Sequence, residues 1–505
     1  MQSDKSIPQA TLFQALIPII VLIVLLTFNV MFYGDMATSG ANQLALILAA
    51  TAAALVGFSL KVSFSRMLKG IVDSITASMS AILILLLIGA LAGTWLISGI
   101  VPTMIYYGLQ VLNPTIFLTA AVIVCAIVSI ATGSSWSTVA TVGIALLGIG
   151  KALNIGEGWI AGAIISGAYF GDKLSPMSDT TNLAPAMAGT DLFTHIRYML
   201  ITTVPSMILT LLIFLGVGLF TDHDASVNNT AALSEAVREK FYISPVLFIA
   251  PAIVIWMIVK KVNALPALLA GVLLGALFAV IFQPHIIAEV AGATGSYVKQ
   301  SYMAIINAMG GSVSVASDNE IAAGLLSSRG MAGMLNTIWL ILCALSFGGV
   351  MEAVGLLKRI TSPLVKKAKS NGSLVATTAG SCVFINVTAS DQYLSIVVPG
   401  KMFAQTYKER GLAPQNLSRT LEDAGTVTSV LVPWNTCGAT QTAVLGVSTF
   451  VYAPFCFFNI ISPFMTILVA YLGFKVAKLP PSKMDDVHPA QVSDDPSEKP
   501  VEYMQ

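Results

Sequence analysis

A polar segment with two carboxylates lies inside a hydrophobic part of the chain. Residues 171–182 read GDKLSPMSDTTN. Its side chains with oxygen donors are Asp172, Ser175, Ser178, Asp179, Thr180 and Asn182. Hard cations such as Na⁺ prefer oxygen ligands over sulfur or imidazole. Because charged groups at membrane depth are costly and usually functional, this segment predicts an ion-binding site with Asp172 and Asp179 as charged ligands.

The same segment should interrupt a helix. Pro176 lacks an N–H donor and disfavours helix at Ser175. The backbone groups that such a break exposes need partners inside a membrane, and a bound ion can be one of them. A buried carboxylate can hold either a proton or a cation, which is the minimal chemistry of an exchanger. Two simpler interpretations stay open: Asp172 could pair with Lys173 at a helix end, and Asp179 could cap a helix.

Three other polar clusters interrupt apolar sequence, two of them between pairs of apolar arms. The candidate ligands that they add are Thr132, Ser134, Asn386, Thr388, Ser390, Asp391, Asn435 and Thr436. Asp391 is the third carboxylate predicted to bind the metal ion. Hydroxyl groups in membrane helices also serve as packing contacts, whereas a buried amide always needs hydrogen-bond partners.

Composition places these clusters in a membrane. The chain has 505 residues, of which 56% are hydrophobic and 10% charged, and its mean hydropathy is +0.82. A soluble domain carries about 25% charged residues. The net charge of +1 gives no sign of nucleic-acid binding, and the five cysteines show no metal-binding or disulfide spacing. We see no nucleotide motif, so the chain is not expected to be an enzyme or to need a cofactor.

The chain repeats itself at a spacing of 257 residues. Pro433 follows Pro176 by this distance, and each lies in a polar, interrupted segment. At the same spacing the polar tip at 132–138 falls on the tip at 389–395. Repeats with discontinuous helices are typical of secondary transporters, whose sites lie where the two repeats meet.

Charge predicts the topology of the two repeats. Lys and Arg gather at 61–69, at 260–261 and at 358–369, and such clusters mark cytoplasmic loops. All of them fall on one side if the two polar tips belong to hairpins that do not cross the membrane. We therefore predict an all-α polytopic membrane protein with two inverted repeats, each with five transmembrane helices, a re-entrant hairpin and a discontinuous helix. Both termini would be cytoplasmic.

The predicted segments follow one another without a separate soluble domain. A cytoplasmic N-terminus at 1–13 is followed by repeat 1 at 14–220, with its hairpin at about 116–150 and its broken helix at about 158–186. An extracytoplasmic loop at 221–241 leads to repeat 2 at 242–474, with its hairpin at about 373–407 and its broken helix at about 420–445. The chain ends in a disordered cytoplasmic tail at 475–505. The loops are too small for a sensing domain, and we see no filter-like repeat of a channel.

Two stretches carry a resemblance to a known family. Residues 167–185, GAYFGDKLSPMSDTTNLAP, and residues 386–403, NVTASDQYLSIVVPGKMF, resemble the NhaC-type Na⁺/H⁺ antiporter family of the ion-transporter superfamily. The resemblance covers about 14–474. It implies export of Na⁺ in exchange for H⁺, by alternating access, in the bacterial inner (plasma) membrane. Similar proteins exchange malate or lactate together with Na⁺ and H⁺, so a coupled organic-acid antiporter is the alternative.

The charges near the tips favour the inorganic cation. A carrier of organic anions needs a cationic group or helix N-termini at its site, and Lys173 is the only such side chain in the tips and broken segments. The expected partners are Na⁺, H⁺ and the lipid bilayer, with a homodimer as an option and no nucleic acid.

Overall fold

The computed structural model describes residues 10–479, apart from 34–35, 38, 112, 221–233, 293–294, 318–322 and 324. The predicted N-terminal segment, the loop at 221–241 and the C-terminal tail therefore lie largely outside the described residues. Within them the chain is almost entirely helical, which confirms the predicted class. A two-stranded antiparallel ribbon, β1 (Val313–Ser314) and β2 (Ser327–Ser328), is the departure from an all-α chain among the described residues.

The first half of the chain ends with the long helix α11. Its helices are α1 (Leu12–Tyr33), α2 (Ala41–Ser59), α3 (Phe64–Ala77), α4 (Met79–Ile97), α5 (Ile100–Val111), α6 (Pro114–Thr132), α7 (Ser135–Thr138), α8 (Ile144–Ala152), α9 (Glu157–Leu174), α10 (Asp179–Ala188) and α11 (Leu192–Phe220). A π-helical turn, Val139–Gly143, joins α7 to α8.

The second half has a similar series of helices. They are α13 (Ile249–Val259), α14 (Ala264–Phe282), α15 (Pro284–Ala291), α16 (Tyr297–Gly310), α18 (Leu335–Ala353), α19 (Leu356–Lys367), α20 (Asn371–Thr388), α21 (Gln392–Glu409), α22 (Gln415–Leu421), α23 (Thr436–Leu445), α24 (Thr449–Tyr452) and α25 (Phe457–Tyr471). A π-helical segment, Glu422–Thr426, continues α22.

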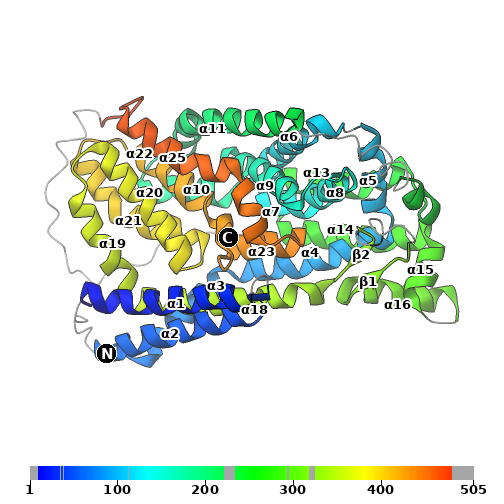
Figure 1. Ribbon diagram of the computed structural model, residues 1–505, viewed down its shortest axis with the longest axis horizontal. Coiled ribbons are helices and arrows are strands. Elements are labelled where there is room, and N and C mark those ends of the chain that lie inside the picture. Colours follow the sequence, from blue (N-terminus) through cyan, green and yellow to red (C-terminus); the bar gives the residue numbers. More distant parts are fainter. Residues whose placement is uncertain are drawn as a thin grey trace.

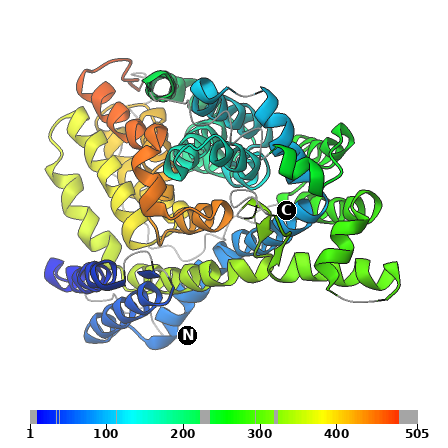
Figure 2. The same ribbon diagram turned by 45° about the vertical axis from the view of Figure 1, so that its right-hand side comes forward.

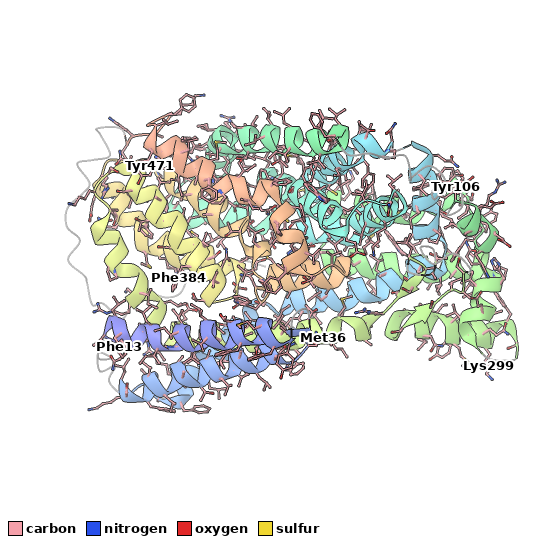
Figure 3. The ribbon with its side chains drawn as sticks, viewed as in Figure 1. Phe13, Met36, Tyr106, Lys299, Phe384 and Tyr471 are labelled. Atoms are coloured by element: carbon pink, nitrogen blue, oxygen red, sulfur yellow. The ribbon has the colours of Figure 1, made fainter. Side chains whose placement is uncertain are left out.

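Seven helices in the described part of the chain are long and apolar enough to cross a membrane, or nine spans if two bent pairs each count as one. Large apolar side chains cover the outside of the molecule, as at Phe13 and Tyr471 (Figure 3). A soluble protein would bury such side chains, so the surface fits a lipid environment. The helices of the predicted hairpins and broken segments fall outside this set, apart from α6, because they are shorter or more polar.

The helix boundaries recur at the spacing seen in the sequence. Helices α6 and α20 begin 257 residues apart, as do α7 and α21, and α10 and α23 match at both ends. The backbone repeats as well: Gly133 and Ser390, which are equivalent at this spacing, both adopt left-handed conformations, with φ of 70° and 59°. Such a residue ends a helix and turns the chain. The inversion of the two units across a membrane stays a prediction.

The two halves enclose a central region in which the broken helices meet. Helices α1, α2 and α18 lie along one long side of the molecule, and α6 and α11 lie along the opposite side (Figures 1 and 2). Helix α9 packs closely on α6 because it presents glycines there. A Cβ atom added at Gly167 or Gly171 would lie 2.2 or 2.4 Å from the backbone oxygens of Val122 and Ala126. Small residues allow such close approach of membrane helices.

Candidate functional site

The segment with Asp172 and Asp179 is a break between two helices. Helix α9 ends at Leu174 and α10 begins at Asp179, as Pro176 leads us to expect. The hydroxyl of Thr181 donates to the carbonyls of Asp172 and Lys173, at 3.2 and 3.1 Å. These bonds supply partners to carbonyls at the end of α9, and they fix the start of α10 against the end of α9.

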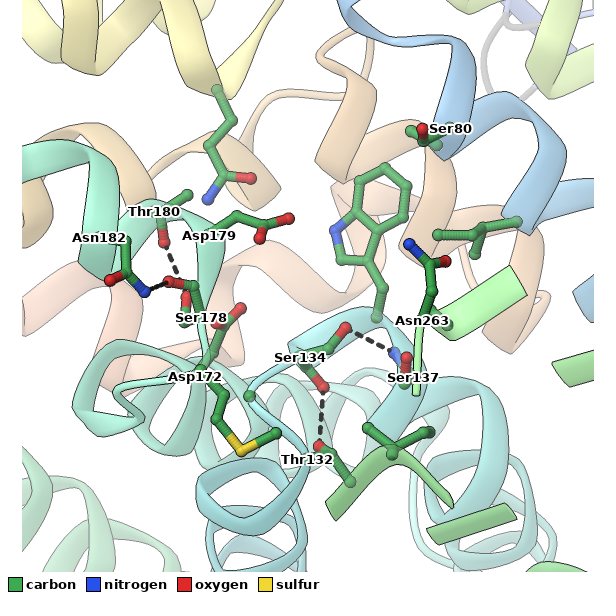
Figure 4. Close-up of a pocket in the computed structure, with 18 of the residues that line it drawn as sticks. Ser80, Thr132, Ser134, Ser137, Asp172, Ser178, Asp179, Thr180, Asn182 and Asn263 are labelled. Atoms are coloured by element: carbon green, nitrogen blue, oxygen red, sulfur yellow. Dashed lines mark hydrogen bonds between the residues drawn. The ribbon is translucent and has the colours of Figure 1, made fainter. Parts of the chain in front are cut away.

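A cavity of about 480 Å³ lies where this break meets the tip between α6 and α7 and the tip between α20 and α21 (Figure 4). The predicted ligands that line it are Thr132, Ser134, Asp172, Ser178, Asp179, Thr180, Asn182, Asp391 and Thr436. The three predicted carboxylates thus share one cavity, although 219 residues separate Asp172 from Asp391. Trp136 and Tyr393, which are equivalent in the repeat, line it as well.

Asp172 is held by the first residue of α7. The backbone N–H and the hydroxyl of Ser135 both donate to Oδ2 of Asp172, at 3.1 and 2.6 Å. The carboxylate is buried, with 8% of the residue exposed. Donors to a carboxylate stabilise its ionised form. The sequence prediction included Ser134 and not Ser135.

Asp391 caps helix α21. Its Oδ1 accepts a hydrogen bond from the N–H of Leu394 at 2.9 Å, and its Oδ2 accepts one from the hydroxyl of Ser78 at 3.2 Å. Ser78 lies between α3 and α4, at a helix break that the sequence did not reveal. In the other half Ser134 caps α7 in the same way, by accepting from the N–H of Ser137 at 3.2 Å. Ser134 and Asp391 are equivalent at the 257-residue spacing. The helix cap therefore occurs in both halves, whereas the negative charge occurs only at Asp391.

Asp179 is the first residue of α10 and borders the cavity (Figure 4). Tyr393, from α21, interacts with its carboxylate. The helix cap is Ser178, whose hydroxyl accepts from the N–H of Thr181 at 3.5 Å. The alternative interpretation of Asp179 as the cap is therefore wrong. Its negative charge in the first turn is favourable to the helix dipole, and its side chain remains available to the cavity.

Three predicted ligands, Asn386, Thr388 and Asn435, lie at or near the tip between α20 and α21 but outside the cavity lining. The amide nitrogen of Asn386 donates to the carbonyl of Gly425 and to the hydroxyl of Thr428, at 2.7 and 3.0 Å. The amide nitrogen of Asn435 donates to Oδ1 of Asn386 at 3.1 Å. The hydroxyl of Thr388 donates to a carbonyl one turn earlier. All three side chains lie outside the cavity lining, and the two asparagines join the tip to the second broken segment.

Two more predicted ligands, Ser175 and Ser390, also lie outside the cavity lining. The hydroxyl of Ser175 donates to the carbonyl of Ile130 at 2.9 Å, which joins the break to the end of α6. The carbonyl of Ser390 accepts from the N–H of Thr436 at 3.0 Å. Its hydroxyl has no hydrogen-bond partner among the residues that the structure describes. Both serines therefore connect the tips to the broken helices.

Lys173 forms a buried ion pair with Asp423 in the opposite half of the chain, and neither side chain is exposed. The hydroxyl of Thr202 donates to the other oxygen of Asp423 at 2.8 Å. The alternative that Lys173 pairs with Asp172 is therefore wrong. Lys173 also does not line the cavity, so it is not placed to bind an anion there.

A second cavity, of about 620 Å³, adjoins the first and shares Asp391 and Tyr393 with it. Charged side chains line it, among them Arg66, Lys69 and Glu352. Arg66 and Lys69 belong to the first basic cluster, for which a cytoplasmic position is a prediction from the sequence. Asp391 and Tyr393 thus separate the central cavity from a charged vestibule.

The helices, the buried carboxylates and the apolar outer surface define a multi-pass helical membrane protein with a polar central cavity. A family model described as the Na⁺/H⁺ antiporter family matches residues 167–474. The chain is 39% identical over 433 residues to the Na(+)/H(+) antiporter NhaC of Alkalihalophilus pseudofirmus, with 86% of this chain and 90% of the relative covered. It belongs to the Na⁺/H⁺ antiporter family, which confirms the resemblance seen in the sequence.

Two relatives from Bacillus subtilis differ in their named substrates. Its Na(+)/H(+) antiporter NhaC is 36% identical over 405 residues, covering 80% of this chain and 86% of the relative. Its malate-2H(+)/Na(+)-lactate antiporter is 38% identical over 432 residues, covering 85% and 89%. Overall identity therefore does not separate the two kinds of substrate, and the residues of the cavity must do so.

Proposed function

We propose that this protein exports Na⁺ in exchange for H⁺ by alternating access in the bacterial inner (plasma) membrane. The observation that carries the proposal is the convergence of Asp172, Asp179 and Asp391 on one cavity, together with hydroxyl and amide oxygens. The family assignment supports it.

The chemistry follows from the donor set. Na⁺ is the transported substrate, and its ligands would be carboxylate oxygens of Asp172, Asp179 and Asp391, with hydroxyl groups of the tips completing its shell. When Na⁺ leaves, the same carboxylates lose their counter-ion inside a partly dry cavity and bind protons. Occupancy by one ion excludes the other, so each cycle exchanges them.

Alternating access would come from movement of the two repeats against each other. Helices at 116–150 and at 373–407 would act as re-entrant hairpins, and both termini would face the cytoplasm. The recurrence of helix boundaries and of left-handed residues supports two equivalent units. The vestibule lined by Arg66 and Lys69 would then connect the central cavity to the cytoplasm.

Coupled exchange of malate or lactate is the second candidate, because one relative that is 38% identical carries that name. A carboxylate substrate would need a cationic partner in the cavity. Lys173, the cation nearest in sequence to the carboxylates, is paired with Asp423 and lies outside the lining. Lys261 does line the cavity, but it is exposed. The three carboxylates would repel an organic anion, which favours Na⁺ alone.

Purified full-length protein in proteoliposomes tests this choice directly. The vesicles would contain Na⁺ and a pH gradient and no organic acid, and a pH-sensitive dye would follow proton movement on addition of Na⁺. We expect Na⁺-dependent proton flux in the wild type and, at the same Na⁺ concentration, much less in Asp172→Asn. Flux that requires malate or lactate would instead establish the organic-acid antiporter.

A further inference from the structure

A second group of ionisable side chains is buried behind the central cavity. We define the Glu422 cluster as Glu422 and Asp423 at the start of the π-helical segment, Arg419 one turn before them, Lys173 from α9 and His195 from α11. Each of these residues has 0% of its surface exposed, and none lines the cavity. π-Helical turns cost stability and occur most often at functional sites.

Within the described part of the chain, neither carboxylate oxygen of Glu422 has a hydrogen-bond partner. Thr426, one turn later, lies beside the carboxylate, but no hydrogen bond of ordinary geometry joins them. Asp423, in contrast, has both an ion pair with Lys173 and a bond from Thr202. An ionised carboxylate without partners is very costly in a buried place. Glu422 therefore calls for a bound species that satisfies it.

The repeat shows that the fold does not require a carboxylate at this position. Residue 165 is the counterpart of Glu422 at the 257-residue spacing, and it is Ile165, which is fully buried in α9. Gly162 and Ser166 stand where the second half has Arg419 and Asp423. One half thus fills this place with apolar and small side chains, so the charges in the other half serve a purpose other than packing.

The surrounding groups favour a proton over a second metal ion. Lys173 and Asp172 on α9 and Asp423 on its own segment interact electrostatically with Glu422. The ionisable groups on packed elements include Arg419 of α22, His195 of α11, Cys382 of α20, Tyr393 and Tyr407 of α21 and Asp179 of α10, while α25 presents the buried neutral side chains Asn459, Ser462 and Thr466. The ammonium group of Lys173 would repel a Na⁺ ion at Glu422, whereas a proton neutralises the carboxylate by forming an O–H bond with it.

We propose that Glu422 is a proton-binding site distinct from the Na⁺ cavity and coupled to it; this proposal rests on the proposed Na⁺/H⁺ exchange. An O–H bond forms on one carboxylate oxygen when a proton arrives from water, and it breaks when the proton returns to water. As long as Asp172 has lost Na⁺ and has not yet bound a proton, it is negative and disfavours a second negative charge at Glu422, which keeps the proton there. Na⁺ at Asp172 cancels that repulsion and releases the proton. Na⁺ binding thus expels H⁺, which is the sense of an antiport.

The test separates proton coupling from Na⁺ handling in proteoliposomes with the full-length protein. One assay measures exchange of ²²Na⁺ for Na⁺ at equal pH, which moves no net proton. The other measures proton flux driven by a Na⁺ gradient. For Glu422→Gln we expect ²²Na⁺ exchange within about 3-fold of wild type and proton flux lower by about 10-fold or more, the size of a typical coupling between sites. Glu409→Gln, at the exposed end of α21, is the matched control and should leave both unchanged.

Two results would overturn the proposal. Unchanged proton flux in Glu422→Gln would show that the residue carries no proton, and loss of both activities would show a structural role. If Glu422→Gln does not insert, Glu422→Asp keeps a titratable group: a displaced pH profile of proton flux supports the site, and a wild-type profile contradicts it. If the wild type lacked both activities, the proposed Na⁺/H⁺ exchange itself would be refuted. That outcome differs from the results for the Glu422 variants, which test only the proton site.

Discussion

Replacing Asp172 by Asn removes one charge from the cavity and almost nothing else. The side chain keeps its shape, and the amide oxygen can still accept hydrogen bonds from Ser135. What is lost is the attraction between the carboxylate and Na⁺. Two unit charges about 4 Å apart attract by about 4 kcal/mol at the effective dielectric of a partly solvated protein site. Since about 1.4 kcal/mol corresponds to tenfold in affinity, Na⁺ should bind about 1,000-fold more weakly.

The assay is the Na⁺ concentration that gives half-maximal proton flux in everted membrane vesicles. Ser135→Ala is the graded control, because it removes the hydroxyl donor at 2.6 Å and leaves the backbone donor at 3.1 Å. A hydrogen bond to a charged group contributes about 1.5–3 kcal/mol, so this variant should weaken Na⁺ binding by about 10- to 100-fold.

The expected order of apparent Na⁺ affinity is therefore wild type, Ser135→Ala and Asp172→Asn. A half-maximal Na⁺ concentration close to the wild-type value in Asp172→Asn would refute the assignment of Asp172 as a ligand. If Ser135→Ala were the more severe change, the contact would serve to shape the tip and not to prepare the carboxylate.

Three further predictions concern other parts of the site. Asp391→Ser should keep the cap of α21, as Ser134 does for α7, while lowering transport; unchanged transport in vesicles would make Asp391 a cap only. Asp423→Asn leaves Lys173 buried without an ionic partner, so thermal unfolding in detergent should show a loss of about 3–5 kcal/mol; the double variant Lys173→Met, Asp423→Leu should recover much of it, and no recovery would contradict the pairing. Exchange should increase between about pH 6 and 9, because Na⁺ then competes with fewer protons for the carboxylates, and a flat profile would exclude a shared site.

The sequence allowed prediction of the parts of the site that depend on local chemistry. Carboxylates within apolar sequence marked the cavity, because such groups are rarely placed in a membrane without a function. Pro176 marked the break after α9, because it cannot continue a helix. The break at Ser78 had no such marker, since no proline or glycine lies there. This helix end is in contact with the other half of the chain, through Asp391. The residues around Ser78 therefore do not by themselves predict it.

Contacts between distant segments were out of reach for the same reason. Lys173 and Asp423 are 250 residues apart, and nothing in either neighbourhood identifies the other. Ser135, and not Ser134, donates to Asp172. Which of two neighbouring serines points toward α9 depends on the orientation of the tip, and the sequence does not show that orientation. Asn386 and Asn435 needed partners, as a membrane amide must, but only the folded chain shows that they are hydrogen-bonded to each other.

The repeat explains why these carboxylates are informative even though some of them also have structural contacts. At the 257-residue spacing, Asp172 corresponds to Ser429, Asp179 to Thr436, Asp391 to Ser134 and Glu422 to Ile165. In every pair the other half builds the same helix boundary or the same buried position with an uncharged side chain. The architecture therefore does not need the charge at these positions. Asp172, Asp391 and Glu422 are buried, and burying a charge is costly. In the proposed exchange, a bound Na⁺ or H⁺ offsets that cost, so the unequal distribution of charge over two similar halves supports the proposed site.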